Sequence, residues 1–208
     1  MCIRDRLYGT LVGISKFEVK DIEFHHPNLP KAFDGYRIVQ LSDIHIGSWI
    51  DNEKPINELV ELVNAQKPDL IVFTGDLVNQ RSCELEGFQD ILAQLHAKDG
   101  VYSILGNHDY GSYYHWKNLK EQVNNIDNLV RMQKAMGWKL LNNEYDILHH
   151  EGDSIALIGV ENDGEPPFSQ FADLKKATKG TDGMFRILLS HNPCLLYTSP
   201  SPRDSTSS

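Results

Sequence analysis

Short apolar segments that alternate with amphipathic helical segments restrict the fold of this 208-residue chain more than any other feature. Residues 36–42, 69–75 and 100–106 are apolar and in part β-branched, as buried strands are. A stripe of apolar residues at helical spacing lies in each of the two gaps between them: Ile56, Leu59, Val60 and Val63, which follow Pro55, in the first, and Leu85, Phe88, Leu92 and Leu95 in the second. Buried strands separated by helices predict an α/β fold.

The second half of the chain differs from the first in the spacing of its predicted strands. An amphipathic stretch over about 112–136 predicts a long helix, and three closely spaced strands follow within 138–160. Residues 171–177 read as helical, and 185–190 read as a last apolar strand. Residues 17–24 (FEVKDIEF) alternate apolar and polar side chains, which is typical of a half-exposed strand. We therefore expect a second, more antiparallel sheet.

The composition excludes some classes of function. A formal net charge of −9 argues against nucleic-acid binding through a broad basic surface, so no nucleic-acid partner is expected. The three cysteines have neither CxxC nor disulfide spacing and leave the compartment undecided. No apolar run reaches 18 residues, and the segment at 7–14 is too short to span a bilayer.

The two ends of the chain differ from its middle. The head (1–6) and the Ser/Pro/Thr-rich tail (196–208) resemble translated sequencing-adapter sequence, and we expect both to be non-native and the tail to be disordered. Residues 7–35 are predicted to form an N-terminal strand and linker. Residues 36–195 are predicted to form one functional domain.

Each of the most apolar strands ends in polar residues. Asp43 and His45 follow the first, Gly75-Asp76 the second, Gly106-Asn107-His108-Asp109 the third, and Ser190-His191-Asn192-Pro193 the last. Loops beyond the carboxyl ends of strands form the functional crevice in layered α/β folds. A turn or a cap would explain any one of these groups alone, but their order and strand context together predict one convergent site.

The donor types at these strand ends point to a metal centre. Carboxylates, imidazoles and an amide oxygen, without a thiolate, suit Mn²⁺, Fe or Zn²⁺ better than a structural zinc site built from cysteines. Tyr110, Tyr113 and Tyr114 follow the third group and either line a substrate pocket or pack a loop against the long helix.

In this order, D43-I-H45, G75-D76, G106-N107-H108-D109 and S190-H191 resemble the signature of the calcineurin-like metallophosphoesterases. LPKAFDGYRIVQLSDIHIG and GVYSILGNHDY are similar to the bacterial branch that contains membrane-associated phosphoesterases and UDP-2,3-diacylglucosamine hydrolases of the lipid A pathway. The resemblance implies a four-layer α-β-β-α sandwich of two mixed sheets. It also implies two divalent metal ions (Mn, Fe or Zn).

Carried over residue by residue, the resemblance assigns five metal ligands. Asp43 and His45 would bind the first ion, Asp76 would bridge both ions, and Asn107 and His191 would bind the second. It also assigns two catalytic residues: His108 as general acid or electrostatic stabiliser, and Asp109 as the residue that orients its ring.

One departure from the family concerns the end of the chain. The GHxH motif that completes both metal spheres in the family does not follow His191. The resemblance therefore implies that the fold is incomplete at its C-terminus and that this fragment is inactive. It also implies that a membrane anchor precedes residue 7 in the full-length protein, which would then be membrane-associated.

The expected function is hydrolysis of a phosphoester or diphosphate bond in a phosphorylated small-molecule or lipid-linked substrate. The alternative is a non-catalytic scaffold of the same fold that binds protein partners. Such scaffolds typically lose ligands or the catalytic histidine, whereas this chain keeps all six of these residues: Asp43, His45, Asp76, Asn107, His108 and His191. A nucleotide-binding redox domain lacks support, since the chain has neither GxGxxG nor GxxxxGK[ST].

Overall fold

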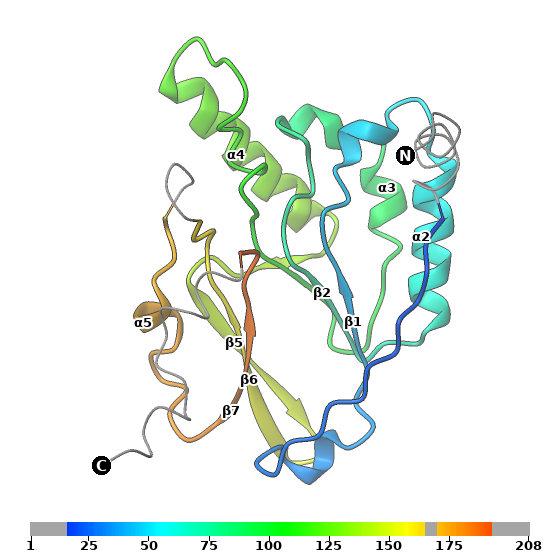
Figure 1. The fold of residues 1–208 in the computed structure, drawn as a ribbon, viewed down its shortest axis with the longest axis vertical. Helices are drawn as coiled ribbons and strands as arrows, with labels where there is room; N and C mark the ends of the chain where they lie inside the picture. Colours follow the sequence, from blue (N-terminus) through cyan, green and yellow to red (C-terminus); the bar gives the residue numbers. More distant parts are fainter. Residues whose placement is uncertain (1–15, 165–169, 193–208) are drawn as a thin grey trace, which may run out of the picture.

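The computed structural model describes residues 16–164 and 170–192, and they form two β-sheets packed face to face with helices outside (Figure 1). The first sheet has the order β1-β2-β3-β4, with β1 at Ile38–Leu41, β2 at Leu70–Phe73, β3 at Val101–Ser103 and β4 at Lys139–Leu140. The second has the order β5-β6-β7, with β5 at Glu144–His150, β6 at Asp153–Gly159 and β7 at Phe185–Leu189.

Helices connect the strands of the first sheet, whose pairs are all parallel. Helix α2 (Lys54–Ala65) follows β1, with Pro55 in its first turn and its apolar stripe buried, as predicted. Helix α4 (Leu119–Ala135) begins later than expected, because the side chain of Asn118 caps it by accepting a hydrogen bond from the Glu121 amide. The crossover through α4 brings β4 beside β3 in the first sheet rather than into the second.

The stripe at 85–95 is buried, but it is not one helix. A 3₁₀ turn, η4 (Ser82–Leu85), and a short helix, α3 (Gln89–Leu92), share it. Gly87, with φ of +89°, separates the two. A left-handed residue cannot continue a right-handed helix, and glycine adopts that conformation without strain.

Three apolar clusters define the layers. Alternate residues of β2 point to opposite faces: Ile71 and Phe73 pack against α2, α3 and α4, whereas Leu70 and Val72 pack against the second sheet. A third cluster lies between the second sheet and helix α5 (Leu174–Ala177) and includes Ile158 and Ala177. The α/β class, the two sheets and the four layers are as predicted, and only the second sheet is mixed.

Two expectations near the N-terminus differ from the structure. Residues 17–24 are extended but pair with no strand among the described residues, so the predicted strand there is wrong. Strand β1 is half-exposed rather than buried, because it lies at the edge of its sheet. The head, the segment at 7–14 and the tail lie outside the described residues. No helix of the described ranges has the length and apolar character needed to cross a membrane.

Candidate metal centre

Backbone hydrogen bonds join the loop after β1 to the loop after β2. The amide of Asp43 donates to the carbonyl of Gly75 at 3.0 Å, that of His45 to Asp76 at 3.1 Å, and that of Ile46 to Leu77 at 2.9 Å. The parallel pairing of the two strands thus continues past their ends. It brings the predicted ligands of both loops to one edge of the sheet.

The loop after β3 closes on the same point. The amide of His108 donates to Asp76 Oδ1 at 2.9 Å. A Cβ atom at Gly106 would lie 2.2 Å from the same oxygen, so only glycine fits there. This close approach explains why glycine precedes Asn107 and His108.

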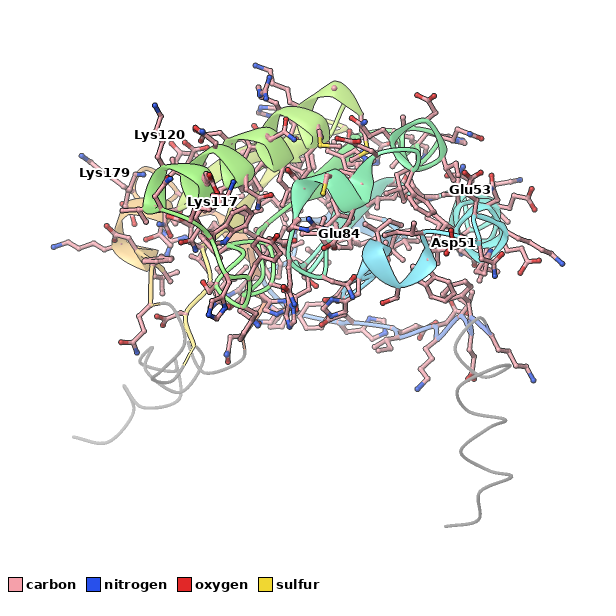
Figure 2. The ribbon with its side chains drawn as sticks, turned by 90° about the horizontal axis from the view of Figure 1, so that it is seen from above. Asp51, Glu53, Glu84, Lys117, Lys120 and Lys179 are labelled. Atoms are coloured by element: carbon pink, nitrogen blue, oxygen red, sulfur yellow. The ribbon has the colours of Figure 1, made fainter. Side chains whose placement is uncertain are left out.

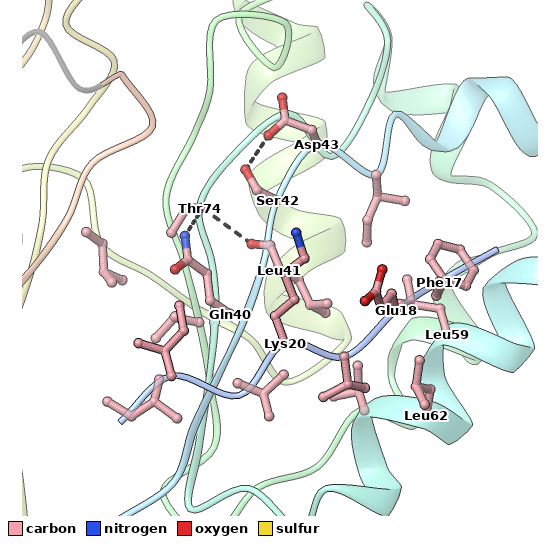
Figure 3. A pocket seen from close by; sticks show the side chains of 18 of the residues that line it. Phe17, Glu18, Lys20, Gln40, Leu41, Ser42, Asp43, Leu59, Leu62 and Thr74 are labelled. Carbon is pink, nitrogen blue, oxygen red and sulfur yellow. Dashed lines mark hydrogen bonds between the residues drawn. The ribbon is translucent and has the colours of Figure 1, made fainter. Parts of the chain in front are cut away.

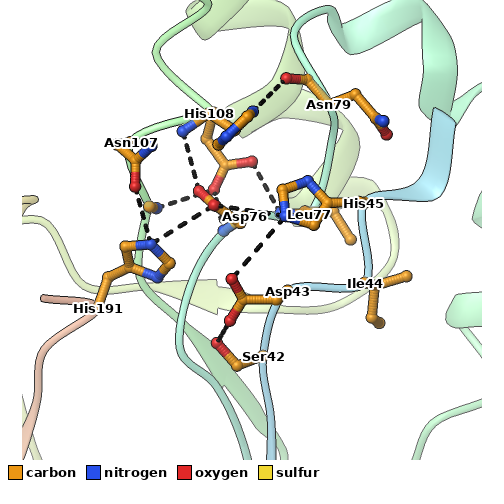
Figure 4. A network of polar contacts seen from close by, with 12 residues as sticks. Ser42, Asp43, Ile44, His45, Asp76, Leu77, Asn79, Asn107, His108 and His191 are labelled. Carbon is orange, nitrogen blue, oxygen red and sulfur yellow. Dashed lines mark hydrogen bonds and ion pairs between the residues drawn. The ribbon is translucent and has the colours of Figure 1, made fainter. Parts of the chain in front are cut away.

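The five predicted metal ligands lie together (Figure 4). His45 Nε2 is 3.6 Å from Asp76 Oδ2 and 3.8 Å from Asp43 Oδ1. His191 Nε2 is 3.5 Å from Asp76 Oδ2 and 3.0 Å from Asn107 Oδ1. One carboxylate oxygen of Asp76 therefore faces both imidazoles.

Backbone contacts fix which nitrogen of His191 faces the site. Its Nδ1 lies 2.8 Å from the carbonyl oxygen of Thr74. A carbonyl only accepts hydrogen bonds, so Nδ1 donates to Thr74 and Nε2 faces the oxygens of Asp76 and Asn107, where a cation between them would take its lone pair. Histidines that bind metals commonly donate their other N–H to a carbonyl in this way.

Unusual backbone conformations gather at this centre. Asp43, His45 and Asp76 all have positive φ, at +55°, +46° and +60°. Such conformations are costly for residues other than glycine and cluster at functional sites, where the surrounding contacts hold them in place.

The donor set fits divalent cations. Two groups of side chains bring their ligand atoms within 4.8 Å of one another: His45, Asp76 and His108 in one, and Asp43, Asp76 and His191 in the other. Asp76 is common to both. Carboxylate and imidazole donors at this spacing are suited to divalent cations.

Asp109 differs from its predicted role. Its fully buried carboxylate accepts backbone hydrogen bonds from Asp76, Leu77, Val78 and Gly106 at 2.9–3.2 Å. Burial raises its pKa to about 7, against the opposing effect of these amides. Asp109 thus holds the turn that carries Asp76. The expectation that it orients the ring of His108 is not met, because its carboxylate oxygens are occupied by that turn.

The ring of His108 is oriented by Asn79, which sequence reasoning missed. His108 Nδ1 lies 2.7 Å from the carbonyl oxygen of Asn79 (Figure 4). A backbone carbonyl leaves no signature in a sequence, so no motif could have indicated it. The ring centroids of Tyr113 and His108 lie 4.7 Å apart. The hydroxyl of Tyr113 accepts a hydrogen bond from Asn107 Nδ2 at 2.9 Å. This bond turns Asn107 Oδ1 toward His191.

An open groove of about 1020 Å³ adjoins Asp43 (Figure 3). Its walls are β1, α2, residues 17–22 and the end of β7. Leu41, Leu59 and Leu62 are among its apolar lining. Two of these walls are edge strands of their sheets, so the groove is suited to further strands as well as to a ligand.

Comparisons with known proteins agree on the family. The chain is 29% identical over 196 residues to a transmembrane protein with a metallophosphoesterase domain of Danio rerio. It is 30% identical over 170 residues to the metallophosphoesterase YkuE of Bacillus subtilis, and 28% identical over 208 residues to the UDP-2,3-diacylglucosamine pyrophosphatase LpxG of Chlamydia trachomatis. These alignments cover 90%, 79% and 82% of the chain but 42%, 54% and 62% of the relatives.

The family model for calcineurin-like phosphoesterases matches residues 36–204, which is most of the chain. The matched range contains all four strand-end groups that converge on Asp76. The chain belongs to the calcineurin-like phosphoesterase family.

Proposed function

We propose that this domain hydrolyses a phosphoester or diphosphate bond with the help of two divalent cations. Asp43, His45 and Asp76 would hold one cation, and Asp76, Asn107 and His191 the other. The observation that carries the proposal is the position of Asp76 Oδ2, 3.6 Å from His45 Nε2 and 3.5 Å from His191 Nε2.

In this proposal the cations and the side chains of the chain have different roles. When bound, two such cations lower the pKa of a coordinated water and offset charge on the phosphoryl oxygens. The chain's own contribution is to fix the donors: Thr74 and Asn79 accept from the Nδ1 atoms of His191 and His108. His108, oriented in this way, would act as the imidazolium: Nδ1–H stays on the Asn79 carbonyl, and Nε2 gives its proton to the leaving oxygen, which leaves the neutral Nδ1–H ring.

The substrate class is the finer part of the proposal. The Chlamydia trachomatis relative is named for a pyrophosphatase acting on a diacylated nucleotide sugar, which supports a phosphorylated small-molecule or lipid-linked substrate. The Danio rerio relative is named a transmembrane protein, which supports membrane association of the full-length protein. The net charge of −9 supports a small substrate over a nucleic acid.

Turnover by the 208 residues alone should be low. Five donors with Asp76 shared give each cation three protein ligands, and water would fill the remaining positions of each ion. Binding of Mn²⁺ by calorimetry is therefore the first test, with hydrolysis of an aryl phosphodiester and of a lipid-linked diphosphate as the second. The exposed Asp51 provides a control carboxylate (Figure 2).

Asp76→Ala should abolish Mn²⁺ binding and any turnover, whereas Asp51→Ala should change neither. His108→Ala should keep Mn²⁺ binding and lower turnover about 10²–10⁴-fold, the range for one acid–base group. Loss of bound Mn²⁺ in the His108 variant would make that histidine a ligand. Undiminished Mn²⁺ binding in the Asp76 variant would contradict the proposal.

A further inference from the structure

A buried carboxylate outside the metal centre holds the loop that orients His108. Glu84 lies in η4, and its residue is 9% exposed. Its Oε2 accepts hydrogen bonds from the amides of Asn79 at 2.6 Å and Gln80 at 3.3 Å, and its Oε1 accepts from Arg81 at 3.1 Å. Three successive amides of one loop therefore depend on one carboxylate.

The same carboxylate lies against the loop that carries His45. A Cβ atom at Gly47 would be 2.6 Å from Glu84 Oε2 and 2.8 Å from Asn79 Oδ1. Asn79 Nδ2 also donates to Ser48 Oγ at 3.1 Å. Gly47, two residues after His45, thus makes room for Glu84, and the carboxylate packs between the first two strand-end loops. In the view of Figure 2, Glu84 lies inward of Asp51 and Glu53.

A hydrogen bond links this loop to the ring of His108. The amide of Asn79 is held by Glu84, and the carbonyl of Asn79 accepts from His108 Nδ1 at 2.7 Å. If the loop moved, Nδ1 would lose its acceptor, and the proton could reside on either ring nitrogen. In the neutral ring, only the Nδ1–H form keeps the hydrogen bond to Asn79 and leaves Nε2 as the atom that takes up the proton to be donated.

We infer that Glu84 is a positioning residue for His108, acting through the backbone of Asn79 to fix the ring and its tautomer. This inference rests on the proposed function only in one respect, which is the catalytic role given to His108. The link from Glu84 to the ring is a property of the chain itself, so it can be measured without metal, substrate or turnover.

The test is the tautomer of His108 in the metal-free 208-residue chain. The ¹⁵N shifts of labelled imidazoles distinguish Nδ1–H from Nε2–H and both from the doubly protonated ring, and the populations are compared where the shifts show the ring to be neutral. A His108→Gln variant assigns the signal. Circular dichroism establishes that each variant is folded.

Wild type should show the Nδ1–H form. Glu84→Ala should shift the population toward Nε2–H or broaden the signal by exchange, and Glu84→Gln, which keeps one acceptor oxygen, should lie between. The exposed neighbour Glu86 supplies the control Glu86→Gln, which should match wild type.

An unchanged Nδ1–H signal in folded Glu84→Ala would overturn the inference, as would an Nε2–H signal in wild type. If Glu84→Ala does not fold, Glu84→Gln decides in the same way. If Mn²⁺ binding depends on Asp76 but the His108 signal is the same with and without Glu84, this inference is overturned and the proposed function is not. A tautomer that follows Glu84 in a chain that binds no Mn²⁺ would instead count against the proposed function.

Discussion

The carboxylate of Asp109 shows how one residue sets the geometry of the centre. Its four backbone hydrogen bonds reach residues 76–78 of one loop and Gly106 of another. Asp76 has a φ of +60° in the turn that these bonds hold. Asp109 thus stabilises a strained conformation that the site needs.

At this scale we predict that Asp109→Ala is strongly destabilising. It would leave four buried amides without an acceptor, at a cost on the order of 3 kcal/mol or more. Asp109→Asn, which keeps one carbonyl oxygen, should cost less. Denaturant unfolding measures both, with Asp127→Ala on the exposed face of α4 as the control. An Asp109→Ala variant as stable as that control would contradict the role given to Asp109.

Sequence reasoning located the candidate ligands because they lie at strand ends, and a strand end is visible in a sequence as the point where an apolar run stops. Asp43, Asp76 and His191 were all found in this way. It did not find Asn79 or Glu84, because their contacts pass through backbone atoms of an irregular loop. The role of Asp109 was misassigned for the same reason, since a motif places residues close in sequence but does not say which atoms meet.

At the scale of the elements, a cluster of three polar side chains joins the two sheets. Tyr102 in β3 donates its hydroxyl to Asp146 Oδ2 of β5 at 2.8 Å, and Lys139 Nζ of β4 lies 3.1 Å from both groups. Burial raises the pKa of Asp146, but the hydrogen bonds from Tyr102 and Lys139 outweigh it, so the pKa lies below its ordinary value. The carboxylate is therefore held in its charged form.

A pKa lowered by folding adds stability above the ordinary value of about 3.9, and that stability is lost as the pH falls through the lowered pKa. We predict that Asp146→Asn flattens the decline in unfolding free energy below about pH 4, and that Lys139→Met flattens it in part. The effect should stay below about 1 kcal/mol, since the group is partly exposed. Unfolding curves measured across this range check it, and a slope that matches wild type in both variants would contradict it.

The order of elements was easier to predict than their extent. The alternation of apolar strands and helices predicted the α/β class and both sheets. The segment at 17–24 has the alternating pattern of a strand. A strand also needs the edge of a neighbouring strand to pair with, and the alternation of side chains does not show whether one is present. Gly87 divides the segment at 85–95 into two short turns. The sequence did not reveal this, because the spacing of the buried residues fits two short turns as well as one helix.

Across the whole molecule, two sheet edges flank one groove. Strands β1 and β7 are terminal in the described sheets, and both line the groove beside Asp43. Ile38, which is 37% exposed, lies on the edge strand β1. Unpaired strand edges next to apolar surface favour association with other strands.

We predict that the 208-residue chain self-associates as its concentration rises and that Ile38→Lys reduces this, because a charge on an edge strand opposes pairing. Ile50→Lys, at an exposed isoleucine outside the strands, is the matched control and should not reduce it. Sedimentation velocity measures the outcome. A wild-type chain that stays monomeric at every concentration would show that these edges are not available.

The shared position of Asp76 is the central claim, and electron paramagnetic resonance of the chain titrated with Mn²⁺ tests it most directly. Two Mn²⁺ ions joined by one carboxylate are magnetically coupled, whereas separate ions give the six-line spectrum of isolated Mn²⁺. We predict a coupled spectrum that grows until two ions are bound, and its loss in Asp76→Asn. A single isolated ion per chain, or a coupled spectrum that persists in Asp76→Asn, would contradict the account.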